Sequence, residues 1–89
     1  MNRPRLDQYL YHTSFFASRA EAQSFINSGF VILNDRVAKP SSPVKNDDVI
    51  KIINDDVYLV IKAQINIENN ICYVGYEVIQ KGKINKASC

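Results

Sequence analysis

Residues 5–52 decide the fold of this chain, and they read, in order, Arg5-Leu6-Asp7, Ser18-Arg19-Ala20-Glu21-Ala22, Gly29, Val31-Ile32-Leu33-Asn34, Lys39-Pro40 and Val44-Lys45-Asn46-Asp47-Asp48-Val49-Ile50. Leu6, Tyr9 and Leu10 recur at the spacing of one helix face, and Pro4 suits a first helical turn. We therefore expect a first helix from this point that fades near residues 12–14.

A second helix is predicted to start at Ser18. The Ser18 hydroxyl can accept a hydrogen bond from the backbone amide of Glu21. The Glu21 side chain can in turn accept from the backbone amide of Ser18, as in a capping box. Ala22, Phe25 and Ile26 share its apolar face, while Gln23, Ser24 and Asn27 point elsewhere. Gly29 is suited to end the helix in a left-handed conformation.

The remainder reads as strands and turns. Residues 31–33 are β-branched or aliphatic, Asn34-Asp35 forms a tight-turn pair, and residues 49–53 follow a loop at 40–43. Asn54-Asp55-Asp56 is a turn. Two β-rich segments, 57–67 and 71–80, are separated by Glu68-Asn69-Asn70, which we interpret as a hairpin loop of about three residues.

In order and spacing, these residues resemble the S4 RNA-binding domain family, a helix-helix-strand module named after ribosomal protein S4. The resemblance implies an α+β fold: an S4-like (alpha-L) module of two helices packed on a small antiparallel sheet, followed by a β-hairpin. The predicted organisation is an RNA-binding module at 1–56, a hairpin extension of the same domain at 57–80 and a basic tail at 81–89.

The family presents the start of its second helix and the neighbouring turn to structured RNA. Carried over position by position, the resemblance implicates the residues that follow as RNA-binding: Arg3, Arg5, Ser18, Arg19, Gln23, Asn27, Arg36, Lys39 and Lys45. The charge distribution agrees, because basic residues outnumber acidic ones in residues 1–45 although the whole chain carries only +2. Arg19 is the strongest candidate; its alternative role is a surface ion pair with Glu21 or Asp7.

Some positions depart from the family pattern. Positions 23, 24, 27 and 28 are often basic or histidine in the family, but here they are uncharged Gln23, Ser24, Asn27 and Ser28. We therefore expect modest affinity with a weak salt dependence. Most of the nine aromatic residues are assigned to the core, and a base-stacking role for any of them is the minority interpretation.

Catalytic function is not indicated. The chain contains no Gly-rich phosphate loop, metal-ligand cluster or nucleophile motif, and Asp47-Asp48 is interpreted as solvated charge in a turn. We expect no catalytic residues, no metal, no cofactor and no small-molecule substrate. Cys72 and Cys89 give no disulfide framework, and no apolar run approaches the length of a membrane span.

The resemblance implies a ribosomal partner. We expect a reduced ribosomal protein S4 that binds ribosomal RNA and neighbouring proteins in the small subunit. The N-terminal residues lack a targeting signal and the chain is rich in Asn and Ile, which favours an organelle-encoded mitochondrial protein, with a bacterial cytoplasm as the alternative. The rival function is a free-standing factor of the heat-shock protein 15 type that acts on stalled large subunits. A third hypothesis is a protein-interaction module that uses the edge of the predicted hairpin at 57–80.

Overall fold

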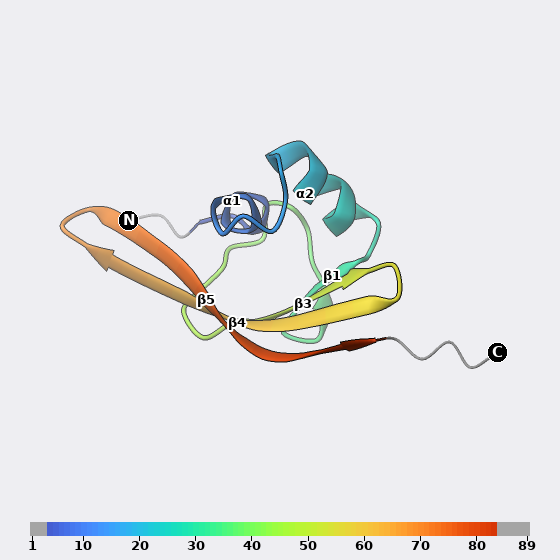
Figure 1. The fold of residues 1–89 in the computed structure, drawn as a ribbon. Coiled ribbons are helices and arrows are strands. Elements are labelled where there is room, and N and C mark those ends of the chain that lie inside the picture. The colour runs from blue at the N-terminus through green and yellow to red at the C-terminus, as the bar shows by residue number, and fades with distance from the viewer. Residues whose placement is uncertain (1–3, 84–89) are drawn as a thin grey trace.

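Two short helices precede five strands in the computed structural model, which describes residues 4–83 (Figure 1). The elements are α1 (Leu6–His12), α2 (Arg19–Asn27), β1 (Val31–Leu33), β2 (Arg36–Val37), β3 (Val49–Asn54), β4 (Val57–Glu68) and β5 (Ile71–Lys83). The strands form one sheet in the order β2-β1-β3-β4-β5, and every neighbouring pair is antiparallel. This confirms the predicted α+β fold.

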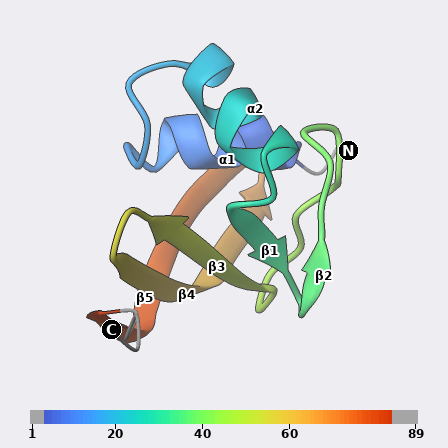
Figure 2. The same ribbon diagram turned by 90° about the vertical axis from the view of Figure 1, so that its right-hand side faces the viewer.

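Both helices cover the same face of the sheet, so the molecule has two layers with the core between them (Figures 1 and 2). Burial alternates along β3, where Ile50 and Ile52 point toward the helices and Lys51 points away. The fully buried members of the core are Leu6, Tyr9, Leu10, Ala22, Val31, Val44, Ile50, Ile61 and Ala63. Because Ile61 and Ala63 lie on β4, the β4–β5 hairpin contributes to the core between the helices and the sheet.

The tight turns are made by residues with positive φ. Asn34 and Asp35 have φ of 51° and 68°, and Asn69 and Asn70 have φ of 52° and 64°. Two successive positive values are the signature of two-residue hairpin turns that match the twist of antiparallel strands. The turn after β4 is thus shorter than the three-residue loop expected, because Glu68 pairs with Ile71 as the last residue of that strand.

The hairpin is also longer at its C-terminal end than the sequence indicated. Lys81 and Lys83, which were expected in a basic tail, pair with Leu59 and Val57 and so belong to β5. The strand continues because β4 offers it a partner along its whole length, apart from a bulge at Val60/Ile61. The rest of the predicted tail, residues 84–89, lies outside the described residues.

The long connection between β2 and β3 is held against the start of α1. Residues 39–45, called here the strap loop, rise from β2 to the beginning of α1 (Figure 2). The amide of Leu6 donates to the Ser42 carbonyl at 2.8 Å, the amide of Val44 donates to the Pro4 carbonyl at 2.9 Å, and Arg5 forms a β-bridge with Pro43. This pairing places the strap loop directly beside Arg5.

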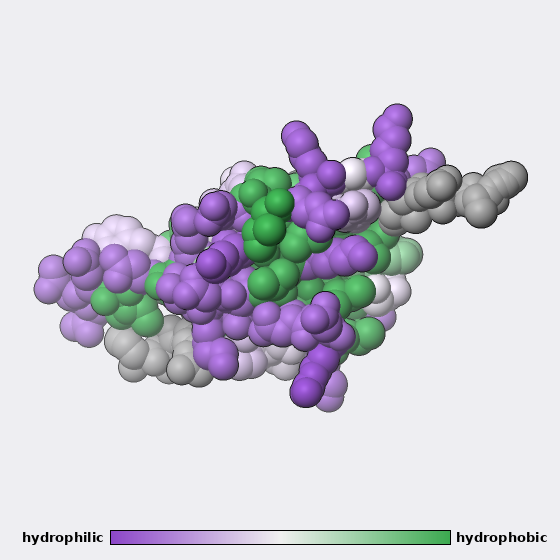
Figure 3. Space-filling model, turned by 90° about the horizontal axis from the view of Figure 1, so that it is seen from below, coloured by the Kyte–Doolittle hydropathy of each residue, from purple (hydrophilic) through white to green (hydrophobic). Residues whose placement is uncertain are grey.

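The far face of the sheet is not covered by the helices. A band of apolar residues crosses it between polar side chains (Figure 3). The register puts Ile32, Val37 and Val60 on this far face, because Ile32 pairs with both Val37 and Lys51, and Lys51 pairs with Val60. Val37 is the most open of them at 74% exposed. We call this band the outer apolar face.

Candidate nucleic-acid interface

A buried carboxylate lies between the two helices and organises the surface above it. Asp7 in the first turn of α1 is completely buried. Its Oδ2 accepts a hydrogen bond from Gln23 Nε2 of α2 at 2.7 Å, and its Oδ1 accepts from the Gln8 amide at 2.8 Å. A charged group without water must be compensated by such donors, so Asp7 ties α2 to the start of α1.

Two arginines complete the shell around this carboxylate. Arg5 Nε lies 3.4 Å from Asp7 Oδ1 and Arg19 Nη2 lies 3.5 Å from Oδ2. Both side chains remain about half exposed, at 47% and 42%. A guanidinium has five N–H donors in a planar fork, and these loose contacts occupy only part of that capacity. The arginine pair, Arg5 and Arg19, is therefore oriented by Asp7 and still open to an anion.

The electrostatics of Asp7 fit this role. Burial on its own would raise the pKa of the carboxyl group. The hydrogen bonds from Gln23 and the Gln8 amide, together with the charges of Arg5 and Arg19, outweigh burial and bring the pKa below its ordinary value of 3.8. Asp7 is thus ionised at neutral pH, and its negative charge offsets part of the positive charge of the arginine pair.

Two backbone amides at the start of α2 already donate to side-chain acceptors of the protein itself. Ser18 Oγ accepts from the Glu21 amide at 3.1 Å, which confirms the predicted cap. The Glu21 carboxylate accepts from the Ala17 amide at 3.0 Å, one residue before the cap that it was expected to reach. Since an acidic side chain already occupies this positive helix end, anion binding here depends on the arginines more than on free amides.

The remaining basic candidates lie along the strap loop and the β1–β2 turn. Arg36, Ser42 and Lys45 line a shallow groove of about 460 Å³ with Leu33 of β1 and Asn34 of the β1–β2 turn. Lys39 is exposed on the same loop, where its amide donates to Ser42 Oγ at 3.0 Å. The strap loop pairs with Arg5 through Pro43, so Lys39 and Lys45 lie on the loop that borders Arg5, while Arg36 lies on β2.

Asp48 borders that groove and contradicts the expectation of a solvated turn carboxylate. It is 8% exposed, and it accepts from Asn34 Nδ2 at 3.0 Å and from the Lys45 amide at 2.8 Å. These bonds hold the strap loop against the β1–β2 turn. Asp47 does match the expectation, since it is exposed in the turn and lies 3.8 Å from Lys62 Nζ.

The outcome differs among the three remaining candidates. Gln23 is half-buried with its amide donor directed to Asp7, whereas the sequence placed it on the exposed side of the helix. Asn27 is exposed at the opposite end of α2, about 12 Å along the axis from Arg19. Arg3 lies outside the described residues. The structure thus groups Arg5, Arg19 and Gln23, and leaves Asn27 apart.

The S4 domain family model matches residues 4–50, more than half of the chain. The chain belongs to the S4 domain family. This confirms the family predicted from the sequence, and the matched residues carry the arginine pair, Asp7 and the strap loop.

A relative and a solved structure extend the comparison. The small ribosomal subunit protein uS4 of Borrelia recurrentis (strain A1) is 34% identical over 55 residues, which are 61% of this S4 chain and 26% of that protein. The chain therefore spans about a quarter of the length of this relative. The trimeric structure of Vibrio cholerae heat shock protein 15 superposes with a TM-score of 0.67 over 82% of both chains, at 23% identity. At that identity the likeness concerns the fold.

Asp7 is the residue whose role sequence reasoning missed. It entered only as an alternative ion-pair partner of Arg19, and the structure makes it the shared partner of Arg5, Arg19 and Gln23. The available signal was its place in the Arg5-Leu6-Asp7 element: an acidic residue next to Leu6 in a short helix lies at the edge of the buried face. In this S4 domain it has a positioning role.

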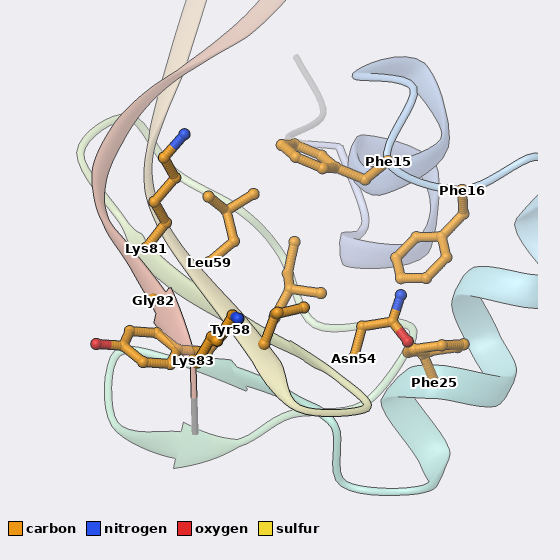
Figure 4. A pocket seen from close by; sticks show the side chains of 11 residues that line it. Phe15, Phe16, Phe25, Asn54, Tyr58, Leu59, Lys81, Gly82 and Lys83 are labelled. Atoms are coloured by element: carbon orange, nitrogen blue, oxygen red, sulfur yellow. The ribbon is translucent and has the colours of Figure 1, made fainter. Parts of the chain in front are cut away.

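The aromatic residues are less buried than expected. Tyr9 and Phe16 belong to the core, but Tyr11, Phe30, Tyr73 and Tyr76 are 41–51% exposed. Phe16 and Phe25 also line a second groove of about 570 Å³, opposite Leu59 and Lys81 at the end of the hairpin (Figure 4).

Within residues 4–83 no group of three His, Cys, Asp or Glu side chains is placed to hold a metal ion. No helix in the same part of the chain is long and apolar enough to cross a membrane.

Proposed function

We propose that this chain binds structured ribosomal RNA, with the arginine pair and the strap loop as the contact surface. The observation that carries the proposal is that two half-exposed guanidinium groups are held 3.4 and 3.5 Å from one fully buried carboxylate. Orientation by a buried anchor reduces the side-chain entropy that phosphate binding would otherwise cost.

The chemistry of the surface suits a phosphate backbone and not a particular base sequence. Guanidinium groups can donate two parallel hydrogen bonds to phosphate oxygens, and the neighbouring lysines add point charges. Asp7 cancels part of this charge, and Gln23 and Asn27 add none. We therefore expect few phosphate contacts and a shallow dependence of affinity on salt.

We further propose that the RNA belongs to the small ribosomal subunit, where the chain acts as a reduced ribosomal protein S4. The identity of 34% to a small-subunit protein supports this setting. The outer apolar face offers a surface for neighbouring ribosomal proteins, since exposed apolar patches commonly mark such contacts. A mitochondrial ribosome is the favoured location, and a bacterial ribosome is the alternative.

A free-standing ribosome-associated factor of the heat-shock protein 15 type is the second candidate. The observation that favours it is the extent of the fold match. The family model stops at residue 50, whereas the match to heat shock protein 15 covers 82% of the chain and so reaches into the β4–β5 hairpin.

The RNA-binding proposal is tested by charge removal. Arg5→Ala and Arg19→Ala should each weaken binding to deproteinised small-subunit ribosomal RNA several-fold and reduce the slope of log affinity against log salt by about 1. Lys83→Ala at the end of β5 is the charge-matched control and should change neither value. Equal effects of all three substitutions would contradict a localised interface.

The proposed location in the small subunit is tested by asking with which ribosomal subunits the tagged chain is recovered. The tagged chain should remain with salt-washed small subunits in stoichiometric amounts. Recovery only with large subunits that carry peptidyl-tRNA would establish the second candidate instead. Binding to a partner that survives nuclease treatment and both arginine substitutions would favour a protein-interaction module.

A further inference from the structure

Two exposed aromatic rings lie at the C-terminal end of α1. Tyr11 lies four residues after Asp7, so it lies on the same side of the helix about 6 Å further along the axis. Its side chain is 41% exposed, and its ring centroid lies 5.4 Å from that of exposed His12, with the planes inclined by 54°. The Tyr11 hydroxyl makes no hydrogen bond to another residue of the 4–83 range.

A groove of about 590 Å³ runs beside these rings. It is lined by Tyr11, His12, Ser14, Phe15, Phe16 and Ala17, and the Glu21 carboxylate accepts from the Ala17 amide beside it. Ser14 has a positive φ of 68° and its amide donates to the Tyr11 carbonyl at 3.0 Å, so the chain turns back sharply at the end of α1. Residues held in such conformations are frequent at binding sites.

The groove lies near Arg19 along the chain. Ala17, one of its lining residues, is two residues before Arg19, so the two Cα atoms are within about 7 Å of each other. One nucleotide can span that distance between its phosphate and its base. Aromatic rings next to phosphate-binding cations are the elements that proteins use to hold single-stranded nucleic acid, because every base has a π-face to stack.

We propose that Tyr11 and His12 form a stacking platform for one unpaired RNA base, in the groove that they line together with Ala17, while Arg19 holds the adjoining phosphate. This proposal rests on the proposed RNA-binding function and makes it more specific: the RNA element must present an extruded base. Irregular RNA provides such bases in loops and bulges, whereas a regular duplex does not.

A fluorescence experiment tests the platform directly, because the chain contains no tryptophan. In the Tyr11→Trp variant the introduced indole is the sole tryptophan, and its emission should be quenched when deproteinised small-subunit ribosomal RNA is added. A fully paired RNA duplex should leave the emission unchanged. Tyr73→Trp, at a similarly exposed site on β5, is the matched control and should respond to neither RNA.

Affinity measurements separate stacking from charge. Tyr11→Ala should weaken binding to the same ribosomal RNA roughly 5- to 150-fold and leave the salt slope unchanged. Tyr11→Phe should bind as the unmodified chain does, because the ring is retained. Arg19→Ala should instead reduce the salt slope.

The outcomes are distinguishable. Loss of binding on Arg19→Ala with unchanged binding on Tyr11→Ala, or no quenching of the introduced indole in the bound complex, would overturn the platform and leave the RNA-binding function intact. Absence of any binding by the unmodified chain would overturn both. Quenching by the duplex to the same extent would also contradict an extruded base.

Discussion

Replacement of Asp7 by asparagine tests whether the buried carboxylate holds the two helices together. Asp7→Asn keeps the size of the side chain but removes its charge and turns one acceptor into a donor. That donor then faces one of the groups that now donate to Asp7: the Gln23 amide, the Gln8 amide or a guanidinium. The site loses charge-assisted hydrogen bonds and gains a donor–donor contact.

The magnitude of the loss follows from these contacts. A hydrogen bond to a charged group contributes about 1.5–3 kcal/mol. The arginine contacts contribute less, because they exceed 3.3 Å and both side chains are about half exposed to screening water. We expect Asp7→Asn to lower the free energy of unfolding at pH 7 by about 2–3 kcal/mol, which is about 10–20 °C in Tm for a domain of this size.

The direction of the pKa shift determines how the stabilisation by Asp7 changes with pH. The folded-state pKa of Asp7 lies below 3.8, so its stabilisation is fully present above that value and is lost as the pH falls through the folded-state pKa. Urea unfolding, followed by circular dichroism, should show a gap between the unmodified chain and Asp7→Asn that narrows at acid pH.

Asp47→Asn is the matched control. It makes the same chemical change at an exposed carboxylate with φ of +73°, where asparagine is well tolerated, so we expect a change below about 1 kcal/mol. A gap for Asp7→Asn that is no larger than that of the control, or that does not depend on pH, would refute the anchoring role.

Three further substitutions test the local structure, each by urea unfolding. Gly29→Ala should cost about 1–2 kcal/mol, because φ is +83° while no atom lies within 4 Å of the added methyl group, so the cost is conformational; a neutral result would mean that the backbone is free to change there. Tyr9→Phe should cost about 1–3 kcal/mol by leaving the Gly75 carbonyl without its donor. Burial raises the pKa of Tyr9 to about 12, so its stabilisation should be lost as the pH rises from 10 to 12, and Tyr9→Phe should lack that loss. Ser18→Ala should cost about 1 kcal/mol because the Glu21 amide loses its acceptor; an unchanged midpoint would show that water replaces the cap.

Local signals in the sequence were sufficient for the helices and turns. The cap at Ser18, the left-handed Gly29 and the Asn34-Asp35 turn each depend on one or two neighbouring residues, and the structure confirms all three. The end of β5 could not be predicted in this way. Its last residues are polar or glycine, and they form a strand because Leu59 and Val57 of β4 offer partners.

The candidate site depends more strongly on tertiary contacts. The burial of Asp7 requires Arg5, Gln23 and Arg19 to converge from two helices, and no periodicity encodes that convergence. Asp48 was misjudged for the same reason, since its principal side-chain partner is Asn34, fourteen residues earlier. A carboxylate in a turn motif reveals nothing of whether another turn will cover it.

The bond between Tyr9 and Gly75 bears on the order of folding. These residues are 66 positions apart, and Ile61 and Ala63 also pack under the helices. During synthesis α1 therefore leaves the ribosome long before the strands that complete its environment, and contacts of such separation slow folding. The side-chain contacts of Asp7 span at most 16 residues and can form first. The arginine pair can thus be oriented in a nascent chain before the sheet is complete.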